Sequence, residues 1–348
     1  MRRSLLASCV ASVLVACAAF SGESEGGSPT GGVAEAGADG ASVDAGAPTD
    51  GALPPDAAEA PQVVLAAGQA GATSIVATSQ GPVWGITVGE AGLLRRAEAS
   101  GAVDLVSYGG GRPSRVVLDG TRLVWGDLGV QKGLRALATA APLYDEAVEA
   151  FASVPKGFLA IREVPKEQSP DGGFDARFLL WTNGVLQVTG HGTYPSRLWD
   201  VVADGDIALV TRDDGTILSF SPANPQAAPT PYVGPEPGCR NLAVNDAGVY
   251  WTRFSQGTVR MRDRTGSLRT LATDQVTPFG LAADASGVYW LTGDGALRRW
   301  NGTQVVTLAS TLALASADGA SRHHPLALTP DAVVLLTATE VLQVKKGP

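Results

Sequence analysis

A pattern of about ten residues, repeated at a spacing of roughly 42 residues, constrains the fold of this chain more than any other feature. Its clearest copies are residues 242–251 and 281–290, in which an apolar run, a turn of small and acidic residues and a second apolar run end in Tyr-Trp. Residues 116–125 match these copies at the same length, and residues 75–84 match them more loosely. Three weaker copies are centred on 159–160, 208–209 and 334–335. Seven copies of one short unit predict a repeat architecture.

Each repeat has the pattern of four short antiparallel strands, a to d. In one of the clear copies, residues 242–244 form a short apolar strand a, and residues 249–252 form an apolar and aromatic strand b of the kind covered on both faces. Residues 258–262 alternate as strand c, and residues 268–272 form strand d. Such a unit at this period is typical of an all-β fold, the β-propeller. We expect seven blades, at residues 72–110, 113–144, 147–192, 196–234, 238–275, 277–311 and 324–345.

The last blade contains only three of its four strands, within residues 324–345. The missing strand d is available at the start of the domain, because residues 62–68 resemble the d strands at 268–273 and 304–310. Pairing of 62–68 with the final blade would close the ring and remove an open sheet edge. The alternative is six blades with a partial seventh as a cap.

The N-terminal residues have the composition of a secretory signal. Arg2 and Arg3 precede a short apolar stretch at 5–15, which is too short for a confident membrane span. Leu-Val-Ala-Cys at 14–17 resembles the bacterial lipobox, and this resemblance implies that 1–16 is a signal peptide and that Cys17 is lipidated. An ordinary signal peptide beside an incidental cysteine is the alternative. The resemblance also implies, from Ala18 after the cysteine, a lipid-anchored protein of the cell envelope, with the outer membrane favoured.

Between the signal and the repeats lies a segment rich in Gly, Ala, Ser and Pro. Residues 18–61 contain eight acidic residues and no Lys or Arg, so we expect 17–61 to form a flexible acidic tether with a reach of roughly 35–40 Å. Residues 62–348, the propeller domain, contain 26 acidic and 24 basic residues. This balance argues against nucleic acid as a partner, because such binding needs a basic surface.

Two repeats carry a more specific resemblance. Gly-Val-Tyr-Trp-Thr at 248–252 and Gly-Val-Tyr-Trp-Leu at 287–291 resemble YWTD-type propeller repeats, and the wider pattern is similar to NHL-like bacterial propellers. The resemblance implies a binding scaffold, since enzymes are a minority in these families. Arg253 and Thr292 stand where the motif has Asp, so the structural Asp of the family is not carried over.

Basic residues gather at the starts of the a strands. In a four-stranded blade the d-to-a and b-to-c connections lie on one face of the ring, here called the d–a face, and the a-to-b and c-to-d connections lie on the opposite a–b face. Four residues near strand starts are predicted to form a positive rim that binds a carboxylate or phosphate group: Arg115, Arg197, Arg240 and His324. The alternative is that they serve solubility and loop capping.

A second candidate on the d–a face is a metal site. Four side chains that suit Zn or Cu lie in or beside d-to-a connections: His191, Cys239, His323 and His324. The alternative is that loops tolerate such residues, which here lack close paired spacing apart from the His323-His324 dipeptide. Acidic residues at 204, 206, 213 and 214 lack the spacing of a calcium loop and indicate turns. No cofactor is predicted.

Two insertions also belong to the d–a face. Residues 164–176 expand a b-to-c turn, and residues 311–323 expand a d-to-a link, whereas 221–230 expand a c-to-d link on the other face. Insertions on one face of a repeat protein are typical of a binding side, and drift in tolerant loops is the alternative. The sequence therefore favours a membrane-anchored, non-enzymatic binding or scaffold protein that takes a protein or small anionic ligand on this face. A propeller hydrolase, lyase or lactonase acting at the channel mouth is the alternative.

Overall fold

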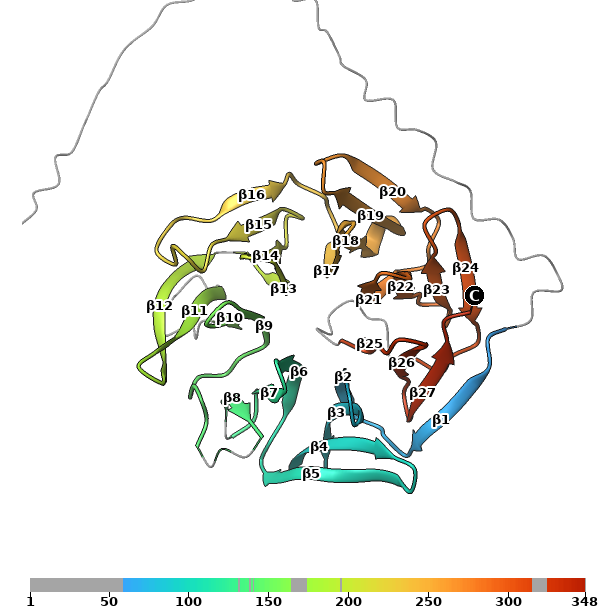
Figure 1. Ribbon diagram of the computed structural model, residues 1–348, viewed down its shortest axis with the longest axis horizontal. Helices are drawn as coiled ribbons and strands as arrows, with labels where there is room; N and C mark the ends of the chain where they lie inside the picture. The colour runs from blue at the N-terminus through green and yellow to red at the C-terminus, as the bar shows by residue number, and fades with distance from the viewer. Residues whose placement is uncertain are drawn as a thin grey trace, which may run out of the picture. The chain divides into compact units, whose positions relative to one another are not determined.

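Seven antiparallel sheets are arranged as blades about a central channel (Figure 1). They are seen in a computed structural model that describes residues 59–130, 132–137, 139, 141–163, 174–194, 196–314 and 324–347. The signal segment, Cys17, His323 and most of both d–a face insertions lie outside the described residues, as does the side chain of His191. In the described part, no helix combines the length and the apolar character that crossing a membrane requires.

The first three blades contain eleven of the described strands. Blade 1 contains β2 (Ala72–Thr78), β3 (Gly81–Val88), β4 (Ala91–Glu98) and β5 (Gly101–Gly109). Blade 2 contains β6 (Pro113–Asp119), β7 (Arg122–Asp127) and β8 (Gly133–Ala136). Blade 3 contains β9 (Ala150–Val154), β10 (Gly157–Glu163), β11 (Phe174–Thr182) and β12 (Val185–Tyr194).

The next three blades follow the same order from the channel outwards. Blade 4 contains β13 (Leu198–Asp204), β14 (Ile207–Arg212), β15 (Ile217–Phe220) and β16 (Thr230–Val233). Blade 5 contains β17 (Cys239–Asn245), β18 (Gly248–Arg253), β19 (Thr258–Asp263) and β20 (Leu268–Ala272), with the 3-10 turn η1 (Phe254–Gln256) after β18. Blade 6 contains β21 (Phe279–Asp284), β22 (Gly287–Leu291), β23 (Leu297–Trp300) and β24 (Val305–Ala309).

The final blade confirms the predicted ring closure. Blade 7 contains β25 (Leu326–Leu328), β26 (Ala332–Leu336) and β27 (Glu340–Lys345), and its outer strand is β1 (Gln62–Ala67). β1 runs antiparallel to β27, with Gln62 opposite Val344 and a bulge between Val64 and Ala66. The early strand therefore completes the last blade, as the sequence predicts, and the six-blade alternative is wrong.

Blade 2 departs from the expected four strands. Its described sheet has three strands, and a single bridge between Leu134 and Tyr144 stands where strand d was expected. Pro142 precedes this bridge by two residues and has no N–H with which to extend a ladder. The outer wall of this blade is consequently a loop rather than a strand.

The blades are joined by apolar cores in which the repeated tryptophan has a constant place. Trp84, Trp125, Trp251 and Trp290 are all buried, each in an apolar cluster that joins two neighbouring blades. Each lies opposite an arginine on strand c of its own blade: Arg95, Arg135, Arg260 and Arg298. A second recurring element is a glutamine fifteen residues before the tryptophan, since Gln69 accepts from Trp84 Nε1 and Gln275 accepts from Trp290 Nε1, each at 3.1 Å. Glu236 occupies the same offset from Trp251 but accepts from Arg260 at 2.7 Å instead.

Candidate functional site

The four predicted rim residues lie beside the d–a ends of inner strands, and contacts join them into two groups. Arg115 lies in β6 and His324 lies two residues before β25, and both approach Asp200 of β13. Arg197 precedes β13 and Arg240 lies in β17, and both pack on Trp199. We call the first group the mouth cluster and the second the arginine–tryptophan stack.

The mouth cluster is centred on Asp200, whose side chain is only 1% exposed. Arg115 Nη1 donates to Asp200 Oδ1 at 2.8 Å and to the Val201 carbonyl at 2.9 Å, so blade 2 reaches across blade 3 to blade 4. The other carboxylate oxygen accepts from the backbone N–H of Leu242 in blade 5 at 2.9 Å. His324 Nε2 lies 3.4 Å from Oδ1. One buried carboxylate therefore connects four blades at the mouth of the channel.

The position of Arg115 differs from the surface rim that the sequence predicts, because its guanidinium is bonded to the buried Asp200. Burial lowers the pKa of its guanidinium, and the Asp200 carboxylate opposes that shift. Its Nη1 is committed to Asp200 and Val201, whereas Nε and Nη2 have no hydrogen bond to a described residue. Arg115 therefore has a structural role through Nη1, whereas its Nε and Nη2 atoms make no hydrogen bond to a described residue. Sequence reasoning missed Asp200, although an acidic residue inside the apolar run Leu-Trp-Asp-Val-Val is itself a signal of a paired buried charge.

The arginine–tryptophan stack lies between blades 4 and 5. The Cζ atoms of Arg240 and Arg197 lie 3.3 Å and 4.1 Å from the centre of the Trp199 ring. Two guanidinium carbons so close to one ring centre would overlap on the same face, so they occupy opposite faces of the indole. Trp199 Nε1 donates to Asp213 Oδ1 at 2.9 Å, which fixes the orientation of the ring. Phe254 adds a further aromatic contact to Arg240, at 5.7 Å from its ring centre.

The electrostatics of the stack are those of two neighbouring cations with one nearby carboxylate. Burial lowers the pKa of Arg240, Asp213 opposes this shift and the neighbouring Arg197 reinforces it. Arg197 Nε is buried without a hydrogen-bond partner among the described residues. Stacking on an indole favours the charged form of each guanidinium.

The channel itself forms a cavity of about 410 Å³ that reaches the mouth cluster. Its wall consists of the inner strands β2, β6, β17, β21 and β25, which contribute small and branched apolar residues. Arg115 and His324 are the residues of its lining with charged or titratable side chains. A second cavity, of about 720 Å³, lies between blades 1 and 2 beside Gln80 and Arg122, on the a–b face.

The predicted metal ligands are not assembled by the residues that the structure describes. Cys239 is buried in the core between blades 4 and 5, packed with Leu242 and Trp251, and burial raises the pKa of its thiol. His324 contacts Asp200 instead. Among the described residues there is no group of three side chains able to hold a metal ion, and His323 and the His191 side chain lie outside them. The metal site stays a prediction, with Cys239 placed as a core residue.

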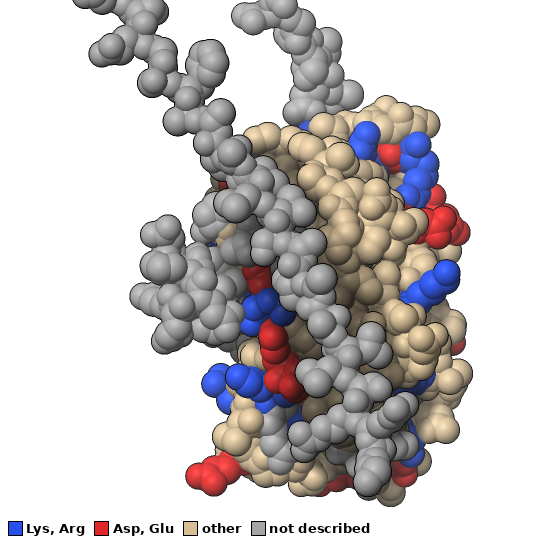
Figure 2. Space-filling view, turned by 90° about the vertical axis from the view of Figure 1, so that its left-hand side faces the viewer, with Lys and Arg blue, Asp and Glu red and all other residues tan. Residues whose placement is uncertain are grey.

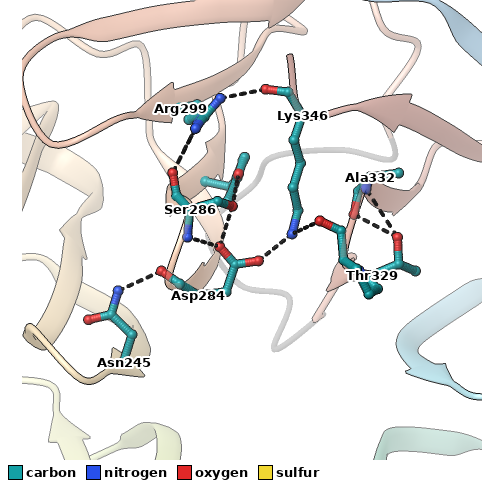
Figure 3. Close-up of polar contacts among 9 residues, drawn as sticks. Asn245, Asp284, Ser286, Arg299, Thr329, Ala332 and Lys346 are labelled. Carbon is teal, nitrogen blue, oxygen red and sulfur yellow. Dashed lines mark hydrogen bonds and ion pairs between the residues drawn. The ribbon is translucent and has the colours of Figure 1, made fainter. Parts of the chain in front are cut away.

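The a–b face has a different kind of polar network. Asp284, the last residue of β21, accepts from the buried ammonium of Lys346 and from Ser286, while Lys346 Nζ also lies 3.3 Å from the Pro330 carbonyl (Figure 3). Arg299 Nη1 donates to the Lys346 carbonyl at 2.7 Å. Burial would raise the pKa of Asp284, but its bonds to Lys346 and Ser286 outweigh burial and hold the pKa below its ordinary value. This network joins the turns of blades 6 and 7.

The outer wall of the ring carries no comparable concentration of charge in the view from β12 (Figure 2). Lys and Arg side chains stand there in small groups near Asp and Glu, with uncharged surface between them.

The chain matches no protein-family model, and no curated protein matches its sequence. Solved structures share the fold. A streptogramin B lyase is 12% identical with a TM-score of 0.57, covering 82% of this chain and 96% of that one. The extracellular domain of a one-component system from B. thetaiotaomicron is 13% identical with a TM-score of 0.58, covering 83% of this chain and 40% of that one. A computationally designed protein, Ika8, is 14% identical with a TM-score of 0.54, covering 83% and 100%. At these identities the likeness establishes a seven-bladed β-propeller.

Proposed function

We propose that this chain is a lipid-anchored, non-enzymatic binding module of the cell envelope whose ligand sits on the d–a face of the propeller. The observation that carries the proposal is the convergence of Arg115, Arg197, Arg240 and His324 at one end of the channel. They come from blades 2, 4, 5 and 7, and all lie in or beside inner strands. A site built from strand ends of a closed ring is positioned without movement of any blade, which favours binding of an anionic group.

The anchoring part of the proposal rests on the sequence. A lipid on Cys17 and a tether at 17–61 would hold the propeller clear of a membrane, and Ala18 favours the outer membrane. Two or more acyl chains give stable attachment, since each buried methylene contributes about 0.8 kcal/mol.

An enzyme at the same mouth is the second candidate. The contact between His324 Nε2 and Asp200 Oδ1, at 3.4 Å, is the kind of pair that handles protons in acid–base catalysis. Asp200 is also bonded to Arg115 and to two backbone N–H groups, which hold its carboxylate in one orientation. A binding module needs these residues only to be positioned and charged, whereas an enzyme would also need them to transfer protons, so we favour the binding module.

Site-specific photo-crosslinking of the full chain in intact cells tests the proposal. A photoreactive residue is placed at exposed positions of the d–a face, Glu90 and Ser255, and at matched exposed positions of the a–b face, Asp206 and Asp246. We expect defined adducts from the first pair alone, lost when Arg197 and Arg240 are both changed to Ala. Adducts of equal yield from both faces, or none from the d–a face, would contradict the proposed binding side.

The same cells also test the lipid anchor and the alternative of an enzyme. Cys17→Ser should release the adduct-forming protein from the membrane fraction or leave it unprocessed, and normal processing with retained membrane binding would overturn the anchor. Chemical conversion of the captured molecule by the wild type, abolished by His324→Ala, would replace the binding module with an enzyme.

A further inference from the structure

We propose that the cavity between blades 1 and 2, on the a–b face, binds an uncharged and largely apolar molecule that carries a hydrogen-bond acceptor such as a carbonyl. The cavity has a volume of about 720 Å³, which is within the range of small-molecule sites. It lies on the face opposite to the mouth cluster, so this second site goes beyond the proposed function, and either of the two can fail without the other.

The junction of blades 5 and 6 shows what fills this place elsewhere in the ring. Trp300, the last residue of strand c, and Val305, the first residue of strand d, pack against the core between those blades. Trp300 lies opposite Val288, which precedes the repeated Trp290 by two residues. Both side chains stand beside the c-to-d connection, on the a–b side of the junction.

The equivalent place between blades 1 and 2 is filled less completely. Leu137 directly follows β8, and its N–H donates to the carbonyl of Leu123, which precedes Trp125 by two residues. Leu137 therefore stands where blade 6 has Trp300, with a much smaller side chain. The described sheet of blade 2 ends at β8, so no described strand supplies a counterpart of Val305. Because Leu137 lines the cavity, we attribute the open volume to this reduced filling.

The residues that line the cavity indicate an uncharged ligand. Its apolar side chains come from both blades: Val83, Leu105, Leu118, Leu123 and Leu137. The two arginines of the lining each have a carboxylate partner already, since Arg96 is paired with Glu98 and Arg122 with Asp119. Neither therefore offers an uncompensated positive charge to an anion, and the apolar wall disfavours any buried charge.

Gln80 supplies a hydrogen-bond donor at the rim of the cavity. Its Oε1 accepts from Arg96 Nη1, and this bond identifies the oxygen of the amide because a guanidinium only donates. Gln80 is exposed, and its Nε2 makes no hydrogen bond to a described residue. The hydroxyl groups of Ser79 and Thr121, which also line the cavity, are further donors. The rim therefore favours an acceptor on an otherwise apolar molecule.

The test compares three probes of similar shape in ligand-observed NMR titrations of the full chain. Benzophenone carries a carbonyl, diphenylmethane lacks one, and diphenylacetate is an anion. We expect benzophenone to bind roughly fivefold more tightly than diphenylmethane, the effect of one net hydrogen bond, and more tightly than the anion. Gln80→Glu replaces the amide nitrogen with an oxygen and should abolish the preference over diphenylmethane. Irradiation of bound benzophenone should label the lining residues, identified by mass spectrometry of peptides.

The decisive variant is Leu137→Trp, which gives blade 2 the side chain that blade 6 has at this position. It should fill the cavity, weaken benzophenone binding by roughly tenfold or more and leave the melting temperature unchanged or higher. Leu268→Trp, on the exposed outer strand of blade 5, is the matched control and should leave the affinity unchanged. If Leu137→Trp does not fold, photolabelling of the wild type decides alone. Labels outside the lining, unchanged affinity in folded Leu137→Trp, or tightest binding of diphenylacetate overturns the proposal.

Discussion

The two faces of this propeller differ in how some of their charged residues are joined. On the a–b face, acids in or beside turns are each bonded to a cation of the same or another blade, as in Asp119 with Arg122, Asp204 with Arg264 and Asp284 with Lys346. On the d–a face, one carboxylate, Asp200, gathers groups from three other blades. Beside it, two arginines share one indole.

The a–b examples join charges in pairs, whereas at the channel mouth one carboxylate joins several blades. The a–b pairs secure turns and neighbouring blades, and their partial exposure makes each of them a modest contribution to stability. The mouth cluster also joins blades that are far apart in the ring, because Arg115 of blade 2 and His324 of blade 7 both approach Asp200 of blade 4. Removing a charge should therefore lower the free energy of unfolding most at the channel mouth, less at the buried end of the a–b network and least at the exposed a–b pairs.

The largest effect is expected for Asp200→Asn. The substitution leaves the Arg115 guanidinium in a buried place without a compensating charge, and an amide nitrogen replaces an oxygen that accepts from backbone N–H groups. We expect the free energy of unfolding to fall by about 3–5 kcal/mol, measured by urea denaturation. Asp213→Asn, on the same blade and face but exposed, is the control and should cost less than about 1 kcal/mol. Equal losses would mean that the mouth cluster does not hold the ring.

Much of the ring was predictable because the repeat is local. The period near 42 residues, the recurring tryptophan in strand b and the similarity of 62–68 to other d strands predict seven blades and their closure. The sequence analysis did not predict the missing fourth strand of blade 2, although Pro142 lacks the N–H that a strand at this place would need. The glutamine fifteen residues before Trp84 and Trp290 was equally visible in the sequence, as a second periodic position.

The candidate site was predictable only in part. Its arginines and His324 were identified because they recur near the starts of strand a, which is again a periodic feature. Their partners were not, since Arg115 and Asp200 are 85 residues apart and meet only when the ring is closed. Trp199 stands two residues from Arg197, but the approach of Arg240 depends on the angle between blades 4 and 5. Periodicity identifies which residues face one end of the channel, and the closed ring decides which of them pair.

An intermediate effect is expected for Asp284→Asn in the a–b network. Asp284 accepts from the buried Lys346 ammonium and from Ser286, so its loss should cost about 1–2 kcal/mol at neutral pH. Because the folded pKa of Asp284 is depressed, its contribution is present above its ordinary value near pH 4 and is lost as the pH falls through the folded pKa. Melting temperatures of wild type and variant should therefore differ at pH 7 and converge in strong acid. A difference that grows on acidification would contradict the assigned role of the carboxylate.

The smallest effect is expected for Arg264→Ala, an exposed pair on the a–b face. Arg264 joins Asp204 of blade 4 to the carbonyl of Asn245 in blade 5, but its side chain is 43% exposed, so water replaces much of what the substitution removes. We expect a loss of no more than about 0.5 kcal/mol in the free energy of unfolding. Arg240→Ala removes an arginine from the opposite face of the same blade junction. The two variants should therefore have similar melting temperatures and differ in anion binding, which only Arg240→Ala weakens. Equal weakening of binding in both would mean that the overall positive charge at this junction attracts the ligand, and the contrast between the two faces would no longer hold.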